Sequence, residues 1–315
     1  MKLQTIIPLK QVENQIHIDS QLLLVGSCFV ENIGRKLIDF KFKSVVNPFG
    51  ILFHPEVIAR TFEYAVNNKK FTASDVLQVG ETYVSFDAHS QLNDADQNRI
   101  LENLNSALET LISSCVASSH IIITLGTAWG YDYKLEHKIV ANCHKIPQRE
   151  FDKKLASPGQ IENALIRIIN SIYKLNTDAH IIFTVSPVRH IKDGFIENQR
   201  SKAHLITAIH NILDSHTDVG YFPSYELMMD ELRDYRFYDR DLIHPNDLAV
   251  DYIWERFSTS YFSSETQAVL KRIEEIQRGL SHRAFNPESK NHQDFLKNLQ
   301  NKIDNLHDSF PHLRF

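Results

Sequence analysis

The chain is poor in cysteine, and its 315 residues hold no apolar run long enough to cross a bilayer. Only Cys28, Cys115 and Cys143 occur, an odd number that argues against a disulfide framework and is typical of a reducing compartment. The first residues carry one early lysine and lack the apolar core of a secretory signal. These absences predict a cytoplasmic protein that does not associate with membranes.

An excess of positive charge is also missing, because 34 Lys and Arg face 39 Asp and Glu, for a formal net charge of -5. The cations are scattered, so we expect no nucleic-acid partner. The sequence has no glycine-rich phosphate loop and no cysteine pair at zinc spacing, which predicts neither a cofactor nor a metal. Hydrophobic residues make up 43% of the chain, the proportion typical of a packed globular protein.

Buried strands and amphipathic helices alternate along the chain in the order typical of a parallel sheet. Strands are predicted at residues 22–25, 43–46, 120–125, 181–185 and 219–222. Helices are predicted at residues 29–40, 55–65, 93–115, 158–175 and 197–214, and after residue 247. We therefore predict a three-layer α/β/α domain with a central parallel sheet over residues 1–262.

Three segments lie outside this alternation. Residues 76–86 alternate like a β-hairpin across Gly80, which predicts a β-rich insertion. Residues 127–157 are predicted to be a second, irregular insertion. Residues 263–315 carry two charged helical patterns separated by a break near Pro287, so we expect a helical tail without chemistry.

Two short motifs have the residue types of an active site. Gly26, Ser27 and Cys28 follow the first buried strand and begin a helix, whose free N–H groups favour negative charge. Far downstream, Asp241 lies three residues before His244. Because the carboxyl ends of parallel strands meet at one edge of a sheet, we expect these residues to meet there. His244 would then be a general base.

The imidazole of His244 needs a carboxylate to hold its tautomer. Asp241 lies three residues before His244, a spacing that lets both side chains reach one cleft. Asp239 is close enough to be an alternative orienter, although its spacing does not match the motif.

Seven segments of the chain, taken together, resemble one known family. They are residues 26–30 (GSCFV), 47–50 (NPFG), 124–129 (TLGTAW), 142–145 (NCHK), 186–190 (SPVRH), 221–226 (YFPSYE) and 230–237 (DELRDYRF). This set resembles the GSCFA family, whose members belong with the SGNH, or GDSL-type, hydrolases. The resemblance spans residues 20 to about 260. It implies a flavodoxin-like SGNH fold and an esterase or acyltransferase that works through a covalent acyl-enzyme and a catalytic triad.

Two neighbouring residues compete for the role of nucleophile. Aligning Gly26 with the glycine of the GDSL pattern places Cys28 on the catalytic serine. A thiol at a helix N-terminus beside an imidazole is expected to have a lowered pKa, which favours Cys28. Ser27 remains a candidate because it lies one residue away and esterases of this clan normally use serine.

The resemblance further implies donors that stabilise an oxyanion, namely the N–H of Cys28, the N–H of Gly50 and a side-chain amide. SGNH enzymes have Gly-x-Asn-Asp where this chain has residues 126–129, GTAW, so the usual asparagine is replaced by Ala128. Three side chains are candidates to replace it: Asn47, Thr127 and Asn142.

Cations near the predicted site offer a second kind of contact. Arg189, His190 and Lys202 are candidates to bind an anionic group of the substrate. Pairing with Asp230, Glu231 or Asp234 within the protein is the alternative for these cations. His190 near Cys143 and His144 lacks the spacing of a metal site.

The expected substrate is a small-molecule or carbohydrate ester, preferably an O-acylated carbohydrate, with an acyl donor if the reaction is a transfer. This substrate class rests on the resemblance alone. The competing hypothesis is a ligand-binding module that keeps the fold without turnover, and the missing asparagine supports it.

Overall fold

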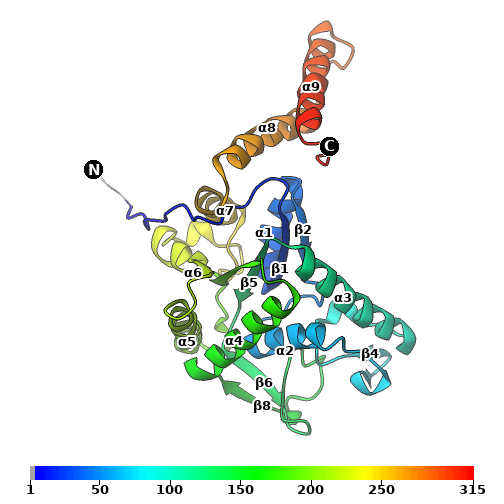
Figure 1. The fold of residues 1–315 in the computed structure, drawn as a ribbon, viewed down its shortest axis with the longest axis vertical. Coiled ribbons are helices and arrows are strands. Elements are labelled where there is room, and N and C mark those ends of the chain that lie inside the picture. Colours follow the sequence, from blue (N-terminus) through cyan, green and yellow to red (C-terminus); the bar gives the residue numbers. More distant parts are fainter. Residues whose placement is uncertain (1–3) are drawn as a thin grey trace.

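Five parallel strands form the central sheet of the computed structural model, which describes residues 4–315 (Figure 1). They are β1 (Gln21–Gly26), β2 (Lys43–Val46), β5 (His120–Leu125), β9 (His180–Val185) and β10 (Val219–Phe222). Their order is β10-β9-β5-β1-β2, and all neighbours pair in parallel. The chain winds outward from β1 to β2 and then returns to the other side of β1, so the winding reverses between β1 and β5. The predicted flavodoxin-like sheet is confirmed.

Helices cover both faces of this sheet, because side chains alternate along each strand. Leu22 and Leu24 pack against α1 (Cys28–Asp39) and α7 (Asp247–Tyr261). Leu23 and Val25 face the opposite layer. That layer consists of α2 (Pro55–Val66), α3 (Gln97–Ala117), α4 (Pro158–Leu175) and α5 (Phe195–Leu213). The three-layer α/β/α prediction is therefore confirmed.

Helix α3 begins four residues later than predicted. Asp96 lies before its first turn, and the carboxylate accepts hydrogen bonds from the N–H groups of Asn98 and Arg99. This N-cap satisfies donors that the first turn leaves free, so the helix starts at Gln97.

The first insertion is the predicted hairpin, in which β3 (Leu77–Val79) and β4 (Thr82–Val84) pair across Gly80. The prediction that the second insertion is irregular is wrong. This insertion forms a three-stranded antiparallel sheet of β6 (Trp129–Tyr133), β7 (Lys138–Val140) and β8 (Phe151–Leu155). In β6 the small residue Gly130 and the acidic residue Asp132 are buried. The aromatic residues that alternate with them are partly exposed: Trp129, Tyr131 and Tyr133. This reversal hides the usual strand pattern.

Short helical segments connect these elements. They are α6 (Ser224–Glu226), a π-helical turn at Leu227–Glu231, and 3-10 turns at Ala73–Asp75, Ser90–Leu92, Gln148–Glu150, Ile191–Asp193 and Tyr235–Phe237.

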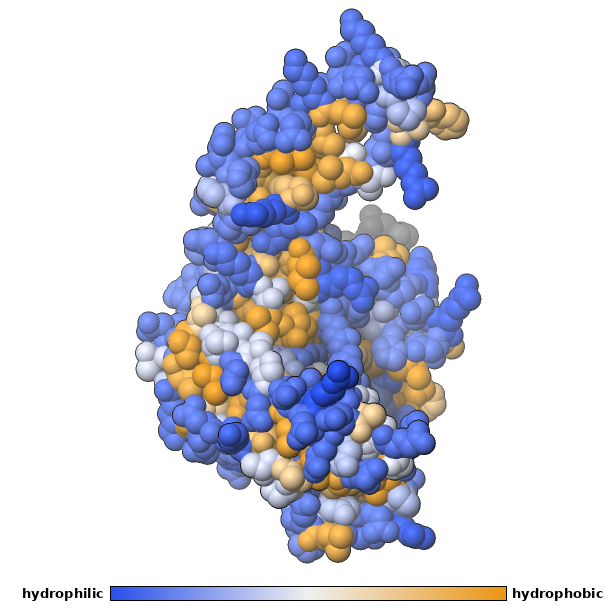
Figure 2. All heavy atoms as spheres, turned by 90° about the vertical axis from the view of Figure 1, so that its right-hand side faces the viewer, coloured by the Kyte–Doolittle hydropathy of each residue, from blue (hydrophilic) through white to orange (hydrophobic). Residues whose placement is uncertain are grey.

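The C-terminal tail consists of α8 (Ser264–Ser281) and α9 (Lys290–Ser309), which extend away from the sheet (Figure 1). Val269 and Ile273 of α8 belong to the same apolar cluster as α1 and α7, so the tail is anchored on that layer. Figure 2 shows the tail as an upper lobe with apolar side chains on its surface. Between residues 4 and 315, no helix is both long and apolar enough to span a membrane.

Candidate active site

The turn after β1 fits only a glycine at position 26. Gly26 has φ +146°, and an added Cβ would collide with the carbonyl oxygen of Thr124 on the neighbouring strand β5. The same carbonyl accepts a hydrogen bond of 3.0 Å from the N–H of Ser27. The close approach of β1 and β5 thus fixes the turn that starts α1, at the point where the sheet reverses its winding.

The two candidate nucleophiles differ in exposure. The Ser27 side chain is 0% exposed, and its hydroxyl has no hydrogen-bond partner within residues 4–315. Cys28 is the first residue of α1 and is partly exposed. Of the two, only Cys28 has a side chain that a substrate could approach.

The expectation of a lowered thiol pKa is wrong. Burial raises the pKa of Cys28 above its ordinary value, and the nearby Glu31 carboxylate raises it further. The Lys202 ammonium and the N–H groups of Cys28 and Phe29 act in the opposite direction. The helix N-terminus therefore acts on the thiol as predicted, but burial outweighs it.

Asp241 and His244 form a closed pair in the loop before α7. The Nδ1 atom of His244 lies 2.6 Å from Oδ2 of Asp241, which leaves Nε2 for proton transfer. The N–H groups of Ile243 and His244 donate to the other carboxylate oxygen. These bonds lower the pKa of Asp241 to about 2. Asp239 instead accepts from the Arg240 N–H, so of these two carboxylates Asp241 is the one that contacts the His244 ring.

Arg189 ties this loop to the carboxyl end of β9. Its N–H donates to the carbonyl of Ile243 at 3.2 Å, and its guanidinium donates to the carbonyl of Leu242 at 3.0 Å. The guanidinium also packs 5.4 Å from the ring centroid of Tyr238. Arg189 therefore holds the His244 loop by donating to the main-chain carbonyls of Leu242 and Ile243.

The alternative of pairing with the acids at 230–234 is wrong for Arg189 and Lys202. In the described chain, Asp230 pairs with Arg233, Asp234 with Arg236 and Glu231 with Arg256.

Lys202 is buried beside the turn, with 1% of its surface exposed. Its ammonium donates to the carbonyls of Gly126 at 2.8 Å and Ser186 at 2.7 Å. Burial lowers its pKa to about 7. Its position on the buried side of α5, in line with Leu205 and Ile209, is the signal that could have predicted this, because a lysine rarely lies on an apolar stripe.

His190 follows β9 and contacts the same edge. Its Nε2 atom is buried without a hydrogen-bond partner in the described part of the chain, and its ring packs edge-on against Phe53. Burial, followed by the charges of Lys202 and His244, lowers its pKa to about 3. The low pKa favours the neutral imidazole, and burial is its main cause.

The predicted oxyanion donors differ in the hydrogen bonds that they already make. The N–H of Gly50 donates to the carbonyl of Asn47 at 2.7 Å, so the prediction of a free donor at Gly50 is wrong. Oδ1 of Asn47 accepts from the N–H of Gly26 at 2.8 Å, and its Nδ2 is buried without a partner in residues 4–315. Oγ1 of Thr127 lies 3.0 Å from the hydroxyl of Ser201. Asn142 accepts from the N–H of His144.

Comparison with known families covers most of this architecture. The GSCFA family profile matches residues 21–257, from β1 through most of α7. The chain belongs to the GSCFA family. A second profile, the GSCFA domain protein C-terminal domain, matches residues 273–315, which lie in the tail. A search of the curated proteins found no match for this GSCFA chain.

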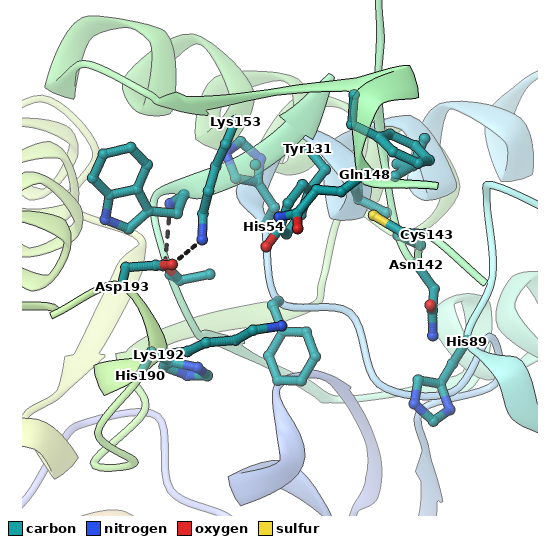
Figure 3. A pocket seen from close by; sticks show the side chains of 18 of the residues that line it. His54, His89, Tyr131, Asn142, Cys143, Gln148, Lys153, His190, Lys192 and Asp193 are labelled. Atoms are coloured by element: carbon teal, nitrogen blue, oxygen red, sulfur yellow. Dashed lines mark hydrogen bonds and ion pairs between the residues drawn. The ribbon is translucent and has the colours of Figure 1, made fainter. Parts of the chain in front are cut away.

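Beside the catalytic candidates, the GSCFA chain has a cavity of about 490 Å³ between the second insertion and the sheet (Figure 3). His190, Thr127 and Asn142 line it, as do residues that the sequence did not single out. These include Phe53, His54, Trp129, Tyr131, Phe151, Lys153 and Asp193. Cys143 also lies in its wall. Aromatic residues at alternate positions of β6 were the available signal.

Lys153 and Asp193 form an ion pair at one side of this cavity (Figure 3). The Lys153 ammonium lies 4.9 Å from the ring centroid of Tyr131 and 5.8 Å from that of Trp129. The GSCFA insertion thus presents rings and charges to the same space. Across residues 4–315, no group of three or more His, Cys, Asp or Glu side chains is arranged to hold a metal ion.

Proposed function

We propose that this GSCFA protein has the SGNH type of active site and transfers acyl groups through a thioester at Cys28. The observation that carries the proposal is the placement of a partly exposed thiol and an Asp241–His244 pair at the carboxyl edge of one parallel sheet. The winding reversal between β1 and β5 is where ligands bind in open α/β sheets. The GSCFA sequence motifs supply the analogy to SGNH enzymes.

The reaction uses His244 as a proton carrier. The Cys28 thiol gives its proton to Nε2 of His244, and Sγ attacks the carbonyl carbon of an ester. The ester C–O bond breaks, the leaving alkoxide takes the proton from His244, and a thioester remains on Cys28. Water or a second hydroxyl then attacks the thioester, gives its proton to His244, and the thiol re-forms. Asp241 holds the imidazole tautomer throughout.

The cavity that His190 lines suits a part of the substrate away from the ester, because neither Cys28 nor His244 is among its lining residues. Trp129 and Tyr131 offer ring faces, and Lys153 and Asp193 offer polar contacts at its side. A pocket that combines aromatic faces with a few polar groups is the usual form of a small-molecule site. We propose an O-acylated carbohydrate as substrate, with a separate acyl donor if the reaction is a transfer.

Mass spectrometry of the intact protein and its peptides tests this proposal. The protein is exposed briefly to p-nitrophenyl acetate and, separately, to acetyl-coenzyme A. We expect an acetyl adduct on Cys28 that is absent in Cys28→Ala and retained in Ser27→Ala. The matched control is Cys143→Ala, because Cys143 is also partly exposed but lies in the cavity wall. It should leave the adduct unchanged.

Variants of the second motif test the role of the pair. His244→Ala should slow acylation by roughly 100- to 10,000-fold, the usual contribution of a general base. Asp241→Asn should slow it markedly, whereas Asp239→Asn should not. If folded Cys28→Ala still acquires the label at the wild-type rate, Cys28 is not the nucleophile.

A binding module without turnover is the second candidate. It is favoured by one observation: in the chain as described, no hydrogen bond joins His244 to Cys28. Hydrogen bonds of this kind often tighten only when substrate is bound. A folded wild-type protein that binds acylated sugars by calorimetry but forms no adduct with either acyl donor would establish this second function.

A further inference from the structure

The position of the Lys202 ammonium is unusual for a lysine. Its carbonyl partners, Gly126 and Ser186, follow the carboxyl ends of β5 and β9, so the charge lies inside the edge where the active site is expected. The ring of Tyr225 lies 5.4 Å away and contributes a cation–π contact. A side chain from α5 therefore delivers a positive charge to the sheet edge.

No acidic residue of residues 4–315 forms an ion pair with this ammonium. Two carbonyl oxygens occupy two of its three N–H donors, and no third partner is found in this part of the chain. Burial of an ammonium without a counter-ion is unfavourable, and such groups are usually paired. Lys202 is therefore a buried ammonium without a counter-ion in this part of the chain.

The strand register places Cys28 next to this charge. Gly26 of β1 is paired with Thr124 of the neighbouring strand β5. Cys28 and Gly126 each follow these paired residues by two positions, so both lie just beyond the carboxyl ends of adjacent strands. Gly126 is the residue whose carbonyl accepts from Lys202. The electrostatics agree with this placement, because Lys202 lowers the pKa of the Cys28 thiol and Cys28 raises that of Lys202.

We propose that Lys202 is a positioning residue whose charge stabilises the negative charge that develops at Cys28. This inference rests on the proposed function, in which the Cys28 thiol loses its proton. Burial opposes the thiolate at this position, and Lys202 is the cation that offsets it. Lys202 thereby supplies an electrostatic contribution in a site where the asparagine of SGNH enzymes is replaced by Ala128.

Alkylation of Cys28 by iodoacetamide, followed by peptide mass spectrometry from pH 6 to 10, tests the proposal without any ester. Lys202→Gln keeps two N–H donors for the carbonyls and removes the charge. We expect its apparent Cys28 pKa to rise, so that alkylation at pH 7 becomes roughly tenfold slower for each unit of rise. Lys202→Arg should stay closer to the wild type.

Cys143 is the internal reference in the same digest. Its alkylation rate should be equal in the wild type and the Lys202 variants, because the charges that act on it are Lys192 and Lys153. An unchanged Cys28 profile in folded Lys202→Gln would overturn the proposal. A parallel change at Cys143 would do the same, since it would indicate a general loss of structure.

A second measurement leaves Lys202 in place, in case its variants do not fold. Cys28→Asp puts a permanent carboxylate beside the ammonium, and Cys28→Asn is the neutral control of equal size. The carboxylate should raise the pKa of Lys202 and reduce the change of unfolding midpoint between pH 7 and 10. Equal pH profiles for the Asp and Asn variants would contradict the proposal.

The two proposals can fail separately. If acyl donors leave no adduct but alkylation still depends on Lys202, the catalytic function is wrong and the charge coupling stands. If the adduct forms on Cys28 at equal rates with and without the Lys202 charge, the function stands and the coupling is wrong.

Discussion

Histidines with buried ring nitrogens lie at both ends of the central sheet, but they differ in whether these nitrogens have partners. At the amino end, Nε2 of His120 lies 3.2 Å from the carbonyl of Asn14, and Nδ1 lies 3.0 Å from the hydroxyl of Ser119. At the carboxyl end, Nε2 of His190 has no partner within the described residues. Burial is the largest cause of a lowered pKa for both, to about 4 for His120 and about 3 for His190.

Two further polar groups at the carboxyl end share this property of His190. The hydroxyl of Ser27, Nδ2 of Asn47 and Nε2 of His190 are all buried and unpartnered within residues 4–315. Native proteins satisfy most of their buried polar groups, so three exceptions at one sheet edge need a cause. Of the three residues, His190 also lines the cavity, whereas Ser27 is 0% exposed, so His190 is the one that a ligand in the cavity would contact. The amino end serves as a reference within the same sheet.

The largest effect is expected from alanine substitutions of glycines at the two ends. Gly26→Ala forces a Cβ into the Thr124 carbonyl at a φ that L residues rarely adopt, so we expect a loss of about 3 kcal/mol or more. Gly220→Ala, near the amino end, meets only His180 and Tyr261 side-chain atoms at 3.2 and 3.3 Å. Its loss of unfolding free energy in urea should be clearly smaller. Equal losses would mean that the turn after β1 is not specially constrained.

Replacement of the two histidines by phenylalanine sharpens the comparison. His120→Phe removes the hydrogen bonds to the Asn14 carbonyl and the Ser119 hydroxyl, so we expect a loss of about 1–3 kcal/mol in urea unfolding. His190→Phe removes no bond from Nε2 and keeps the ring contact with Phe53, so its stability should change less. Acylation of Cys28 should slow only in His190→Phe. A larger stability loss for His190→Phe than for His120→Phe would contradict this comparison of the two ends.

The pH dependence of stability falls in a different window for His120 than for Lys202. The unfolded chain binds a proton at His120 below pH 6.5, while the folded protein does not until about pH 4. Stability therefore falls as pH drops through this window, by up to about 1.4 kcal/mol per pH unit for one group. His120→Phe should flatten the profile there.

Lys202 acts above this window, at the carboxyl end. Its folded pKa of about 7 lies below the ordinary 10.5, so the unfolded state binds more protons between these values, and stability rises with pH. Lys202→Met should flatten the profile from pH 7 to 10.5 and leave the acid window unchanged. Thermal unfolding midpoints across pH 4 to 10 measure both windows.

The sheet was predictable because its strands are continuous apolar runs, as in residues 120–125, which are buried on both faces. The link between Asp241 and His244 was also predictable, because both residues lie in one short loop. The roles of Ser27 and Cys28 were not, since they depend on which neighbouring side chain the turn exposes. Lys202 was placed correctly near the site but with the wrong partners, because only the fold brings two main-chain carbonyls to its ammonium.

The second insertion was missed for a different reason. In β6 the hydrophobic pattern is reversed, with Gly130 and Asp132 buried and the aromatic residues partly exposed. In most strands the apolar side chains point into the core. In β6 the aromatic side chains of Trp129 and Tyr131 face the cavity instead, so the strand does not follow this rule. The feature that obscured the strand in the sequence is the one that lines the cavity.

That insertion forms a sheet separate from the central one, yet it provides much of the cavity wall. Cys28 and His244, by contrast, are fixed by the central sheet and by Arg189. In the proposed function, recognition and chemistry thus occupy different modules of the polypeptide. We expect a chimera that exchanges residues 127–157 between relatives to gain a new ligand preference and to keep the same reaction centre, which would give the family an evolutionary route to new substrates.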